Sequence, residues 1–362
     1  MIQTFTTTPC QDGFRMPGEF EPHTRCWMLW PERTDNWRLS ALPAQKAFAR
    51  VAEAISQFEP VSVGVSTRQL ETAGALLPSG VTLVKMDSDD AWMRDVGPTF
   101  VKNSSGEIRG VDWGFNAWGG LNGGLYSPWD KDEKVAGAVM KNQKINGYKA
   151  PLILEGGAIH TDGQGTLLTT EQCLLNPNRN PSLSKEQIEQ LLKAYLAVDT
   201  ILWLGKGVYM DETDGHVDNL CCFIKPGVVL LTWTDDRSDP QYDISCDALE
   251  RLSMAHDAKG KKLVIHKIHQ PGPLYMREEE SCGIEQSGQA VPRDQGGRLA
   301  GSYVNFYLAN QGIVMPVFDD PRDAEAVALV QSLFPERRVI ALPAREILLG
   351  GGNIHCITQQ QP

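Results

Sequence analysis

The sequence predicts an α/β fold, and two patterns along the chain support this. Short apolar strands alternate with amphipathic helices over most of its length. Five polar turns, spread from the first hundred residues to the last ten, each lead into a strand or hairpin. Their common plan indicates a repeated architecture, although their spacing is irregular. With 362 residues, 41% of them hydrophobic, the chain is long enough for one large repeat-built domain, which we expect over residues 1–362.

The predicted helices have apolar side chains at helical spacing. The clearest spans 181–198, where Ser184 and Gln187 form a capping box. Another is expected at 321–334, with Asp320 as its cap and Pro321 at its first position. Further helices are expected at 42–58, 67–77, 131–142 and 239–257. Strands are expected at 26–30, 61–65, 81–86, 201–204 and 262–268. Residues 111–129, with three tryptophans among many glycines, predict a shaped loop and a candidate lid.

The overall charge limits the class of partner. The net charge is −11 and the sequence pI is about 5.2, which argues against nucleic acid or an anionic membrane. The N-terminal residues are polar, and no stretch approaches the roughly 18 apolar residues of a membrane span. The eight cysteines form no C-x-x-C pair, so we expect reduced thiols in the cytoplasm. A small cationic substrate is compatible with this charge.

The last dozen residues contain the best candidate nucleophile, Cys356. It follows three consecutive glycines, Asn353 and His355, and the run after the glycines predicts a short strand. The alternative is that Cys356 is one more buried small hydrophobe. Residues 155–161 have the same shape, with Gly-Gly-x-Ile-His in register and Thr161 in the place of the cysteine. This second occurrence of the pattern favours a functional role for Cys356.

Three other turns supply candidate acids and a histidine. His216 and Asp218 are two residues apart, which predicts one face of a strand. The pair could be a metal half-site, a general acid–base with a substrate-binding anion, or a structural pair. We favour the second, because an intracellular catalytic cysteine usually needs a histidine near it. No His-x-x-x-His or thiol cluster completes a metal site. Asp95 could merely pair with Arg94, and Glu155 could be a solvated acid, but together these groups indicate a catalytic site.

Four of these turns carry motifs of one enzyme family. The motifs are Trp92-x-Arg94-Asp95-x-Gly97-Pro98, Glu155-Gly-Gly-x-Ile-His160, Asp214-Gly-His216-x-Asp218-Asn and Gly-Gly-Gly-Asn-Ile-His-Cys356. In this order they resemble the agmatine deiminase (agmatine iminohydrolase) family of the guanidine-modifying pentein superfamily. The resemblance extends from Gly18-Glu19-Phe20-Glu21-Pro22-His23 to the Gln-Gln-Gln-Pro tail. It implies a five-bladed α/β propeller of ββαβ units, with the active site on the central axis.

The resemblance also implies a reaction and roles for its residues. Agmatine and water would give N-carbamoylputrescine and ammonia, in polyamine metabolism, with no metal or organic cofactor. Cys356 would attack as thiolate, and His216 would protonate the departing ammonia and then deprotonate the hydrolytic water. Asp95 and Asp218 would hold the planar guanidinium. Glu155 would bind the guanidinium side and orient His216.

The remaining implied residues surround the rest of the substrate. Glu212, with Asp211 as the alternative, is expected to hold the ammonium end. Trp92 and Trp118 are expected to line the part of the site that holds the aliphatic chain of agmatine, although most tryptophans are simply part of a hydrophobic core. Gly352 is expected beside the substrate, in the turn of the nucleophile.

Several alternatives use related chemistry. An arginine or peptidyl-arginine deiminase would place an arginine or backbone donors at the far end of the site. An amidinotransferase would pass the amidino group to an amine, and a non-catalytic guanidine-binding protein would not need Cys356 and His216. A homo-oligomer, dimer or tetramer, is compatible with the sequence. A thiol beside several carboxylates should have a raised pKa, so we expect Cys356 to ionise fully only when the cationic substrate binds.

Overall fold

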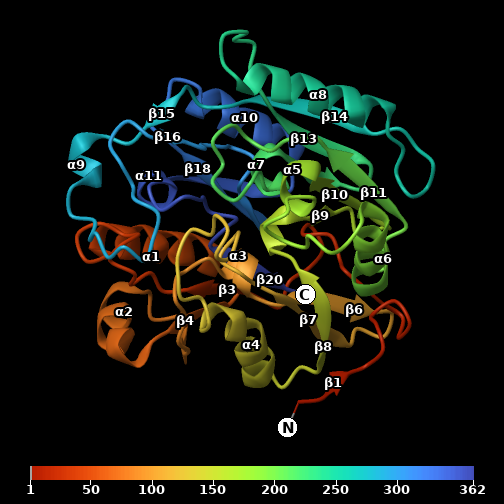
Figure 1. Ribbon diagram of the computed structural model, residues 1–362, viewed down its shortest axis with the longest axis horizontal. Coiled ribbons are helices and arrows are strands. Elements are labelled where there is room, and N and C mark those ends of the chain that lie inside the picture. The colour runs from red at the N-terminus through yellow and green to blue at the C-terminus, as the bar shows by residue number, and fades with distance from the viewer. Residues whose placement is uncertain (1) are drawn as a thin grey trace.

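The computed structural model describes residues 2–362, in which five sheets of three or more strands share one pattern (Figure 1). In each sheet an antiparallel strand pair is followed, through a helix, by a parallel neighbour. The strands of these patterns are β6 (Thr99–Asn103), β7 (Ile108–Gly114) and β8 (Gly147–Ile153); β9 (His160–Thr161), β10 (Thr166–Thr170) and β11 (Thr200–Leu204); β12 (Cys221–Lys225), β13 (Val228–Trp233) and β14 (Val264–His269); β17 (Tyr307–Ala309), β18 (Gly312–Val317) and β19 (Arg338–Pro343); and β20 (Thr358–Gln361), β3 (Arg25–Leu29), β4 (Val61–Val65) and β5 (Thr82–Lys85).

The helices within these patterns connect the parallel strands. In chain order they are α1 (Leu42–Ser56), α2 (Leu70–Leu76), α4 (Val135–Gln143), α6 (Lys185–Leu196), α8 (Gln241–Met254) and α10 (Asp323–Leu333). In Figure 1, α2, α4, α6 and α8 lie toward the rim, whereas α3 (Met93–Val96) and β20 lie near the middle. Within residues 2–362, no helix is long and apolar enough to cross a membrane.

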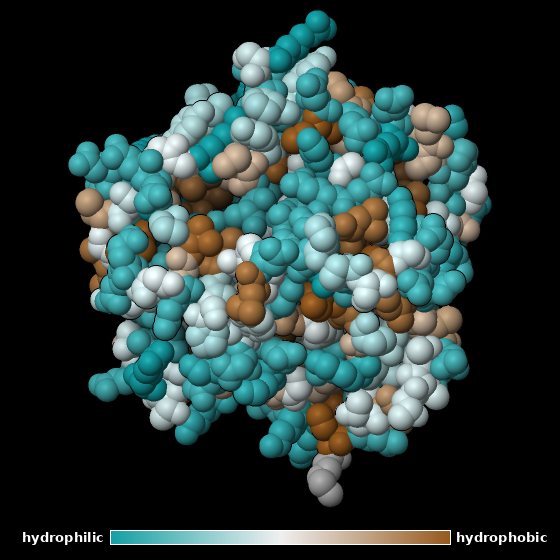
Figure 2. Space-filling model, in the orientation of Figure 1, coloured by the Kyte–Doolittle hydropathy of each residue, from teal (hydrophilic) through white to brown (hydrophobic). Residues whose placement is uncertain are grey.

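Shorter elements complete the fold. Strands β1 (Thr4–Phe5) and β2 (Phe14–Arg15) extend the sheet of β6–β8, and β15 (Leu274–Tyr275) pairs with β16 (Arg298–Leu299). The remaining short helices are η1 (Thr67–Gln69), η2 (Asp132–Lys134), η3 (Gly156–Ala158), α5 (Glu171–Leu174), α7 (Val217–Leu220), α9 (Glu278–Ser281) and α11 (Arg345–Leu348). The face in Figure 2 is mostly hydrophilic, with apolar side chains scattered over it.

The pairing of β20 with β3 joins the end of the chain to its beginning. Thr358 lies opposite Met28, and Gln361 lies opposite Arg25. Around β3 the side chains of Trp27 and Met28 are buried, as is Phe48 of α1. Because β20 is held in register by this buried sheet, the turn immediately before it is fixed in place.

The α/β class predicted from the sequence is confirmed, and most elements lie within a few residues of their predicted ranges. The capping box of α6 is present: Gln187 N–H donates to Ser184 Oγ, and Ser184 N–H donates to Gln187 Oε1. The loop predicted at 111–129 is correct only after residue 114, because its first four residues are the end of β7.

Three local predictions are wrong. Helix α10 begins at Asp323, not at Pro321, because the Asp323 carboxylate accepts the N–H groups of Phe318 and Asp320 and bends the chain ahead of it. Residues 354–357 form turns, and the strand begins only at Thr358.

The third correction concerns His216 and Asp218, which do not lie on a strand. Asp214 and Gly215 have positive φ angles of 65° and 80°, a region that glycine adopts readily. The chain turns there and enters the single helical turn α7. His216 lies immediately before α7, and Asp218 lies within it. Strand β12 starts only at Cys221.

The capping box allows a direct test of stability. Ser184→Ala should lower the free energy of unfolding by about 1 kcal/mol, because an N–H at the start of α6 loses its acceptor. Chemical denaturation would measure this change. The matched control is Ser253→Ala, an exposed serine within α8, which should change the free energy by less than about 0.5 kcal/mol. Equal effects of the two substitutions would contradict the role of the cap.

Candidate active site

Cys356 lies in the turn between α11 and β20. Its backbone carbonyl accepts the N–H of Arg94 (3.1 Å), which ties the turn to α3. Thr358 Oγ1 donates within the same turn to the carbonyls of Ile354 and His355. Cys356 lines a narrow cavity together with Trp92 and Trp118. The predicted nucleophile is therefore held in place at the edge of this cavity.

The glycines before Cys356 allow other side chains to approach it. Gly351 has φ of +109°, and a Cβ there would collide with the carboxylate of Glu212. A Cβ at Gly352 would lie 2.5 Å from the ring of Trp92. Gly352 and the indole of Trp92 both line the cavity. The absence of side chains on these glycines thus gives the cavity its width.

The predicted acids and histidine converge on one point beside the nucleophile. A Cβ on Gly157 would lie 2.6 Å from His216 Nδ1, 2.9 Å from Asp218 Oδ2 and 3.0 Å from Asp95 Oδ1. The Gly157 N–H donates to Asp95 Oδ1 at 2.8 Å. Asp218 Oδ2 lies 3.6 Å from Cys356 Sγ. Asp95, the His216–Asp218 pair and Cys356 lie far apart in the sequence and therefore meet in one cluster.

Glu155 adds a further carboxylate to this cluster, next to His216. Its Oε2 atom is 3.6 Å from His216 Nε2, and its Oε1 atom pairs with Arg179 Nε at 2.7 Å. Both Glu155 and Arg179 are buried, so the interpretation of Glu155 as a solvated loop acid is wrong. Arg179 also pairs with Asp214 at 2.8 Å. The sequence analysis missed Arg179, which belongs to no recognised motif.

The pKa values of His216, Glu155 and Asp95 are shifted by burial and by the charges of their neighbours. Burial acts to lower the pKa of His216, but Asp95 and Glu155 outweigh it, so this pKa lies well above the ordinary value. Burial acts to raise the pKa of Glu155, but Arg179 and His216 lower it to about 2. Burial raises the pKa of Asp95 to about 6, with His216 opposing and Asp218 adding to the rise. The carboxylates around His216 therefore favour its cationic form.

The environment of Cys356 favours the neutral thiol. Burial, followed by the charges of Asp218 and Asp95, raises its pKa well above the ordinary value. Asn305, which precedes β17, donates from Nδ2 to Cys356 Sγ at 3.3 Å and accepts the His355 N–H at 2.9 Å. Sequence reasoning noted the turn of Asn305 but assigned it no role.

The cavity has aromatic walls whose orientation is fixed by carboxylates. Trp92 Nε1 donates to Asp90 Oδ2 and Trp118 Nε1 donates to Asp95 Oδ2, both at 2.9 Å. The two indole rings meet edge to face, with centroids 6.4 Å apart, and Tyr126 also lines the cavity. Both predicted tryptophans therefore border the space beside Cys356, and Trp118 comes from the predicted loop.

The far end of the cavity differs from the expectation. Glu212 lines it, but its carboxylate pairs with Arg293 at 2.9 Å. Arg293 also donates to the carbonyl of Gly350. The alternative acid, Asp211, is not among the residues that line this cavity, and its carboxylate accepts the hydroxyl of Thr213 instead. No local pattern in the sequence distinguished Arg293 from other surface arginines.

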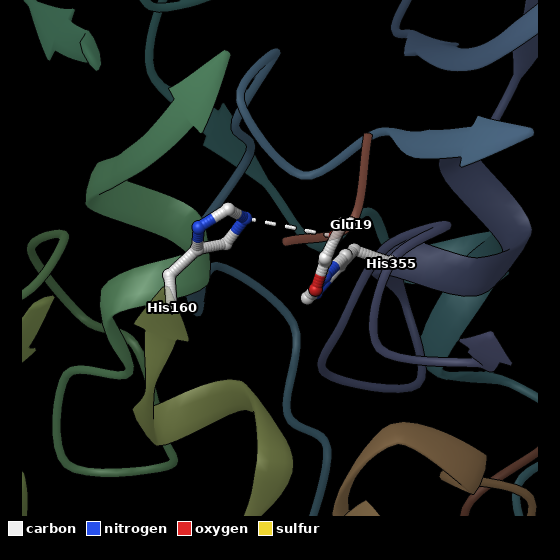
Figure 3. A group of neighbouring side chains, drawn as sticks. All are labelled: Glu19, His160 and His355. Carbon is white, nitrogen blue, oxygen red and sulfur yellow. Dashed lines mark hydrogen bonds and ion pairs between the residues drawn. The ribbon is translucent and has the colours of Figure 1, made fainter. Parts of the chain in front are cut away.

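Two buried groups have the ligand types of a metal site. Within residues 2–362, possible ligand atoms lie within 4.8 Å of one another in the groups Glu19, His160, His355 and Glu155, Cys173, His216. Figure 3 shows the first group. There, His160 Nδ1 accepts the backbone N–H of Phe223, so its Nε2 holds the proton and has no lone pair for a metal. An arginine is bonded to the glutamate of each group, which disfavours an added cation.

Comparison with known proteins supports the family expected from the motifs. The sequence model of the Porphyromonas-type peptidyl-arginine deiminases matches residues 15–362. The agmatine deiminase of Pseudomonas aeruginosa is 59% identical over 359 residues, which cover 99% of this chain and 98% of that protein. The agmatine deiminase of Ectopseudomonas mendocina is 57% identical, with coverages of 100% and 99%.

A solved structure agrees over the same length. The structure described as the agmatine deiminase of Enterococcus faecalis catalysing its reaction superposes with a TM-score of 0.98 at 48% identity, covering 100% of this chain and 99% of that one. The chain therefore belongs to the Porphyromonas-type peptidyl-arginine deiminase family and, within it, to the agmatine deiminases.

Proposed function

We propose that this chain hydrolyses agmatine to N-carbamoylputrescine and ammonia. The observation that carries the proposal is the convergence of Asp95, Asp218 and His216 at Gly157, beside the Cys356 thiol. A planar cation with forked N–H donors suits two carboxylates on either side of it. The named activity of the relatives at 57–59% identity agrees with this chemistry.

The carboxylate of Asp218 has a free site for the guanidinium. Its Oδ1 atom is buried and has no hydrogen-bond partner within residues 2–362. A buried polar atom without a partner is costly, and a guanidinium N–H would satisfy it. Asp95 comes from a different motif. Its two carboxylate oxygens are already oriented, because Oδ1 accepts the Gly157 N–H and Oδ2 accepts the indole N–H of Trp118. Substrate binding would therefore complete the set of hydrogen bonds.

The bound cation also activates the nucleophile. With neutral Cys356, the charges of Asp95 and Glu155 are balanced by those of His216 and Arg179. A guanidinium adds one positive charge to a buried site, which favours loss of the Cys356 proton to solvent. The thiolate then forms in contact with the carbon it attacks, and the free enzyme keeps a less reactive thiol.

The two half-reactions follow from the position of His216. The thiolate forms a C–S bond to the guanidinium carbon, the C–N bond to a terminal nitrogen breaks, and His216 donates the proton that makes ammonia. Neutral His216 then takes a proton from water as the oxygen bonds to the same carbon. The C–S bond breaks, Cys356 leaves as thiolate, and the proton still on the oxygen passes to solvent, which gives the urea N-carbamoylputrescine. The raised pKa of His216 supports its role as the acid of the first step.

The five sheets suggest how the chain forms one site. Each antiparallel pair is preceded by a turn that contributes one part of the cluster, and these parts are Asp95 before β6, Glu155 before β9, His216 and Asp218 before β12, Asn305 before β17 and Cys356 before β20. This order supports a five-bladed α/β propeller, of ββαβ units around a central site, that forms a single domain over residues 1–362. Assembly as a dimer or tetramer stays a prediction, and the proposed compartment is the cytoplasm, where thiols remain reduced.

The first prediction concerns the nucleophile. Cys356→Ser should lower kcat for agmatine by at least about a thousandfold, because a serine hydroxyl is far less acidic than a thiol, while agmatine still binds. Ammonia release and calorimetry would measure the two properties. Mass spectrometry of acid-quenched wild-type enzyme should show an amidino adduct on the Cys356 peptide. The exposed Cys282→Ser is the control and should keep full activity. Ammonia release by Cys356→Ser at a comparable rate would rule out the assignment.

The second prediction concerns metal. Exhaustive dialysis against EDTA should leave kcat and KM unchanged, because the donor groups near His216 are engaged in ion pairs. The same preparation is assayed before and after chelation. Loss of activity with EDTA, restored by zinc or manganese, would instead make His216 and Asp218 metal ligands.

The third prediction concerns the far end of the substrate, where a second candidate activity has one observation in its favour. Arg293 in the same cavity could accept the carboxylate of arginine. In the wild type Arg293 is paired with Glu212, so its charge is less available to that carboxylate, and the agmatine ammonium would share the acid with Arg293. Glu212→Gln should therefore weaken agmatine and free Arg293 for arginine.

The ratio of kcat/KM for agmatine to that for arginine measures this effect. Glu212→Gln should narrow the ratio about tenfold, which corresponds to ~1.4 kcal/mol. The control is Glu285→Gln, since Glu285 bonds to Thr34 outside this cavity and its loss should leave the ratio unchanged. An unchanged ratio in Glu212→Gln would show that this acid does not contact the substrate.

A further inference from the structure

His355, the residue immediately before the nucleophile, bridges two buried carboxylates. Its Nδ1 atom lies 2.9 Å from Asp218 Oδ2, and its Nε2 atom lies 2.9 Å and 3.0 Å from the two oxygens of Glu19. The His355 side chain is 3% exposed. Ionised carboxylates only accept hydrogen bonds, so both ring nitrogens must donate, and only an imidazolium can do this.

The surrounding groups support ionisation of both carboxylates. Burial acts to raise the pKa of Glu19, but Arg94, with His355 and His160, brings it well below the ordinary value. Burial also acts to raise the pKa of Asp218, and the hydrogen bond and charge of His355 outweigh it. Arg94 Nη1 lies 3.1 Å from Glu19 Oε1.

The backbone holds the neighbouring His160 as a neutral ring. Its Nδ1 atom accepts the Phe223 N–H at 3.2 Å, and a backbone N–H can only donate. The proton of His160 is therefore on Nε2, which faces Glu19 at 3.6 Å. Figure 3 shows His160 pointing toward the Glu19–His355 pair. With Arg94 as the one fixed cation against two carboxylates, a second positive charge is needed, and His355 is the group placed to supply it.

We propose that His355 is a positioning residue whose imidazolium keeps Asp218 ionised and turned toward the substrate guanidinium. The role rests on the proposed function, in which Asp218 holds that guanidinium. By engaging Oδ2, His355 leaves the partnerless Oδ1 as the free acceptor of Asp218. None of the motif-based roles assigned above included His355, although it is part of the motif of the nucleophile.

If His355 lost its positive charge, substrate binding would be weakened through Asp218, and the effect would not come from Cys356 alone. Burial by itself favours a protonated Asp218, and a neutral carboxyl holds a guanidinium poorly. The charged or titratable groups that face His355 are Glu19, Asp218, Arg94 and His160, with Cys356 next in the chain. Only Asp218 among them touches both His355 and the thiol.

The first test measures the charge of His355 directly, without substrate. In wild-type enzyme labelled with ¹⁵N at the histidine rings, NMR at pH 8 should show His355 with protons on both nitrogens. His355→Asn assigns the signal by its disappearance. A His355 ring with one bare nitrogen would overturn the proposal. If the enzyme released no ammonia from agmatine, the proposed function would fail, yet this measurement would still decide the charge of His355.

The second test separates the charge from the hydrogen bond. His355→Asn keeps an N–H donor near the position of Nδ1, facing Asp218, but it is neutral. If the charge matters, the acid limb of its kcat/KM profile for agmatine should move up by at least about one pH unit, with KM rising more than kcat at the acid end. His23→Asn removes another buried histidine that pairs with a carboxylate, that of Glu59, and should leave the limb in place. A wild-type profile in His355→Asn, or a loss equal at every pH, would overturn the proposal.

Discussion

The site depends on the pairing of buried charges. Isolated charges are very costly in a protein interior, so each must have a partner. Here Glu155 lies against Arg179, His216 lies between Glu155 and Asp95, and Asp218 and Glu19 face His355 and Arg94. The members of these pairs come from six separate segments of the chain. The charge pairing therefore requires that segments far apart in the sequence come together before the site exists.

This balance explains the behaviour proposed for the nucleophile. A site whose buried charges are already paired accepts one guanidinium most easily by giving up one proton, and the Cys356 thiol is the group in contact with both the cavity and Asp218. Selectivity follows the same principle at the far end, where Glu212 and Arg293 already satisfy each other. The substrate that binds best is the one whose two charged ends both find partners of opposite charge, because it disturbs the pairing of charges in the site least.

Sequence reasoning identified the parts of the site that lie in local motifs. Cys356, His216 and the acids stand in short turns with glycines beside them, which is a pattern visible without a structure. Arg179 and Arg293 could not be found this way, because a buried ion pair depends on two segments meeting in space. The α/β class was predictable from hydrophobic periodicity. The helical turn at Asp218 was not, because positive φ angles at Asp214 and Gly215 override the strand pattern.

The central claim is that this cluster of charges acts on agmatine. The most direct measurement is ammonia release by the purified chain with agmatine, arginine or a peptide containing arginine as the only substrate. The account predicts one ammonia and one N-carbamoylputrescine for each agmatine consumed, and far slower release from the other two. Rapid release from arginine or from the peptide, with none from agmatine, would contradict it.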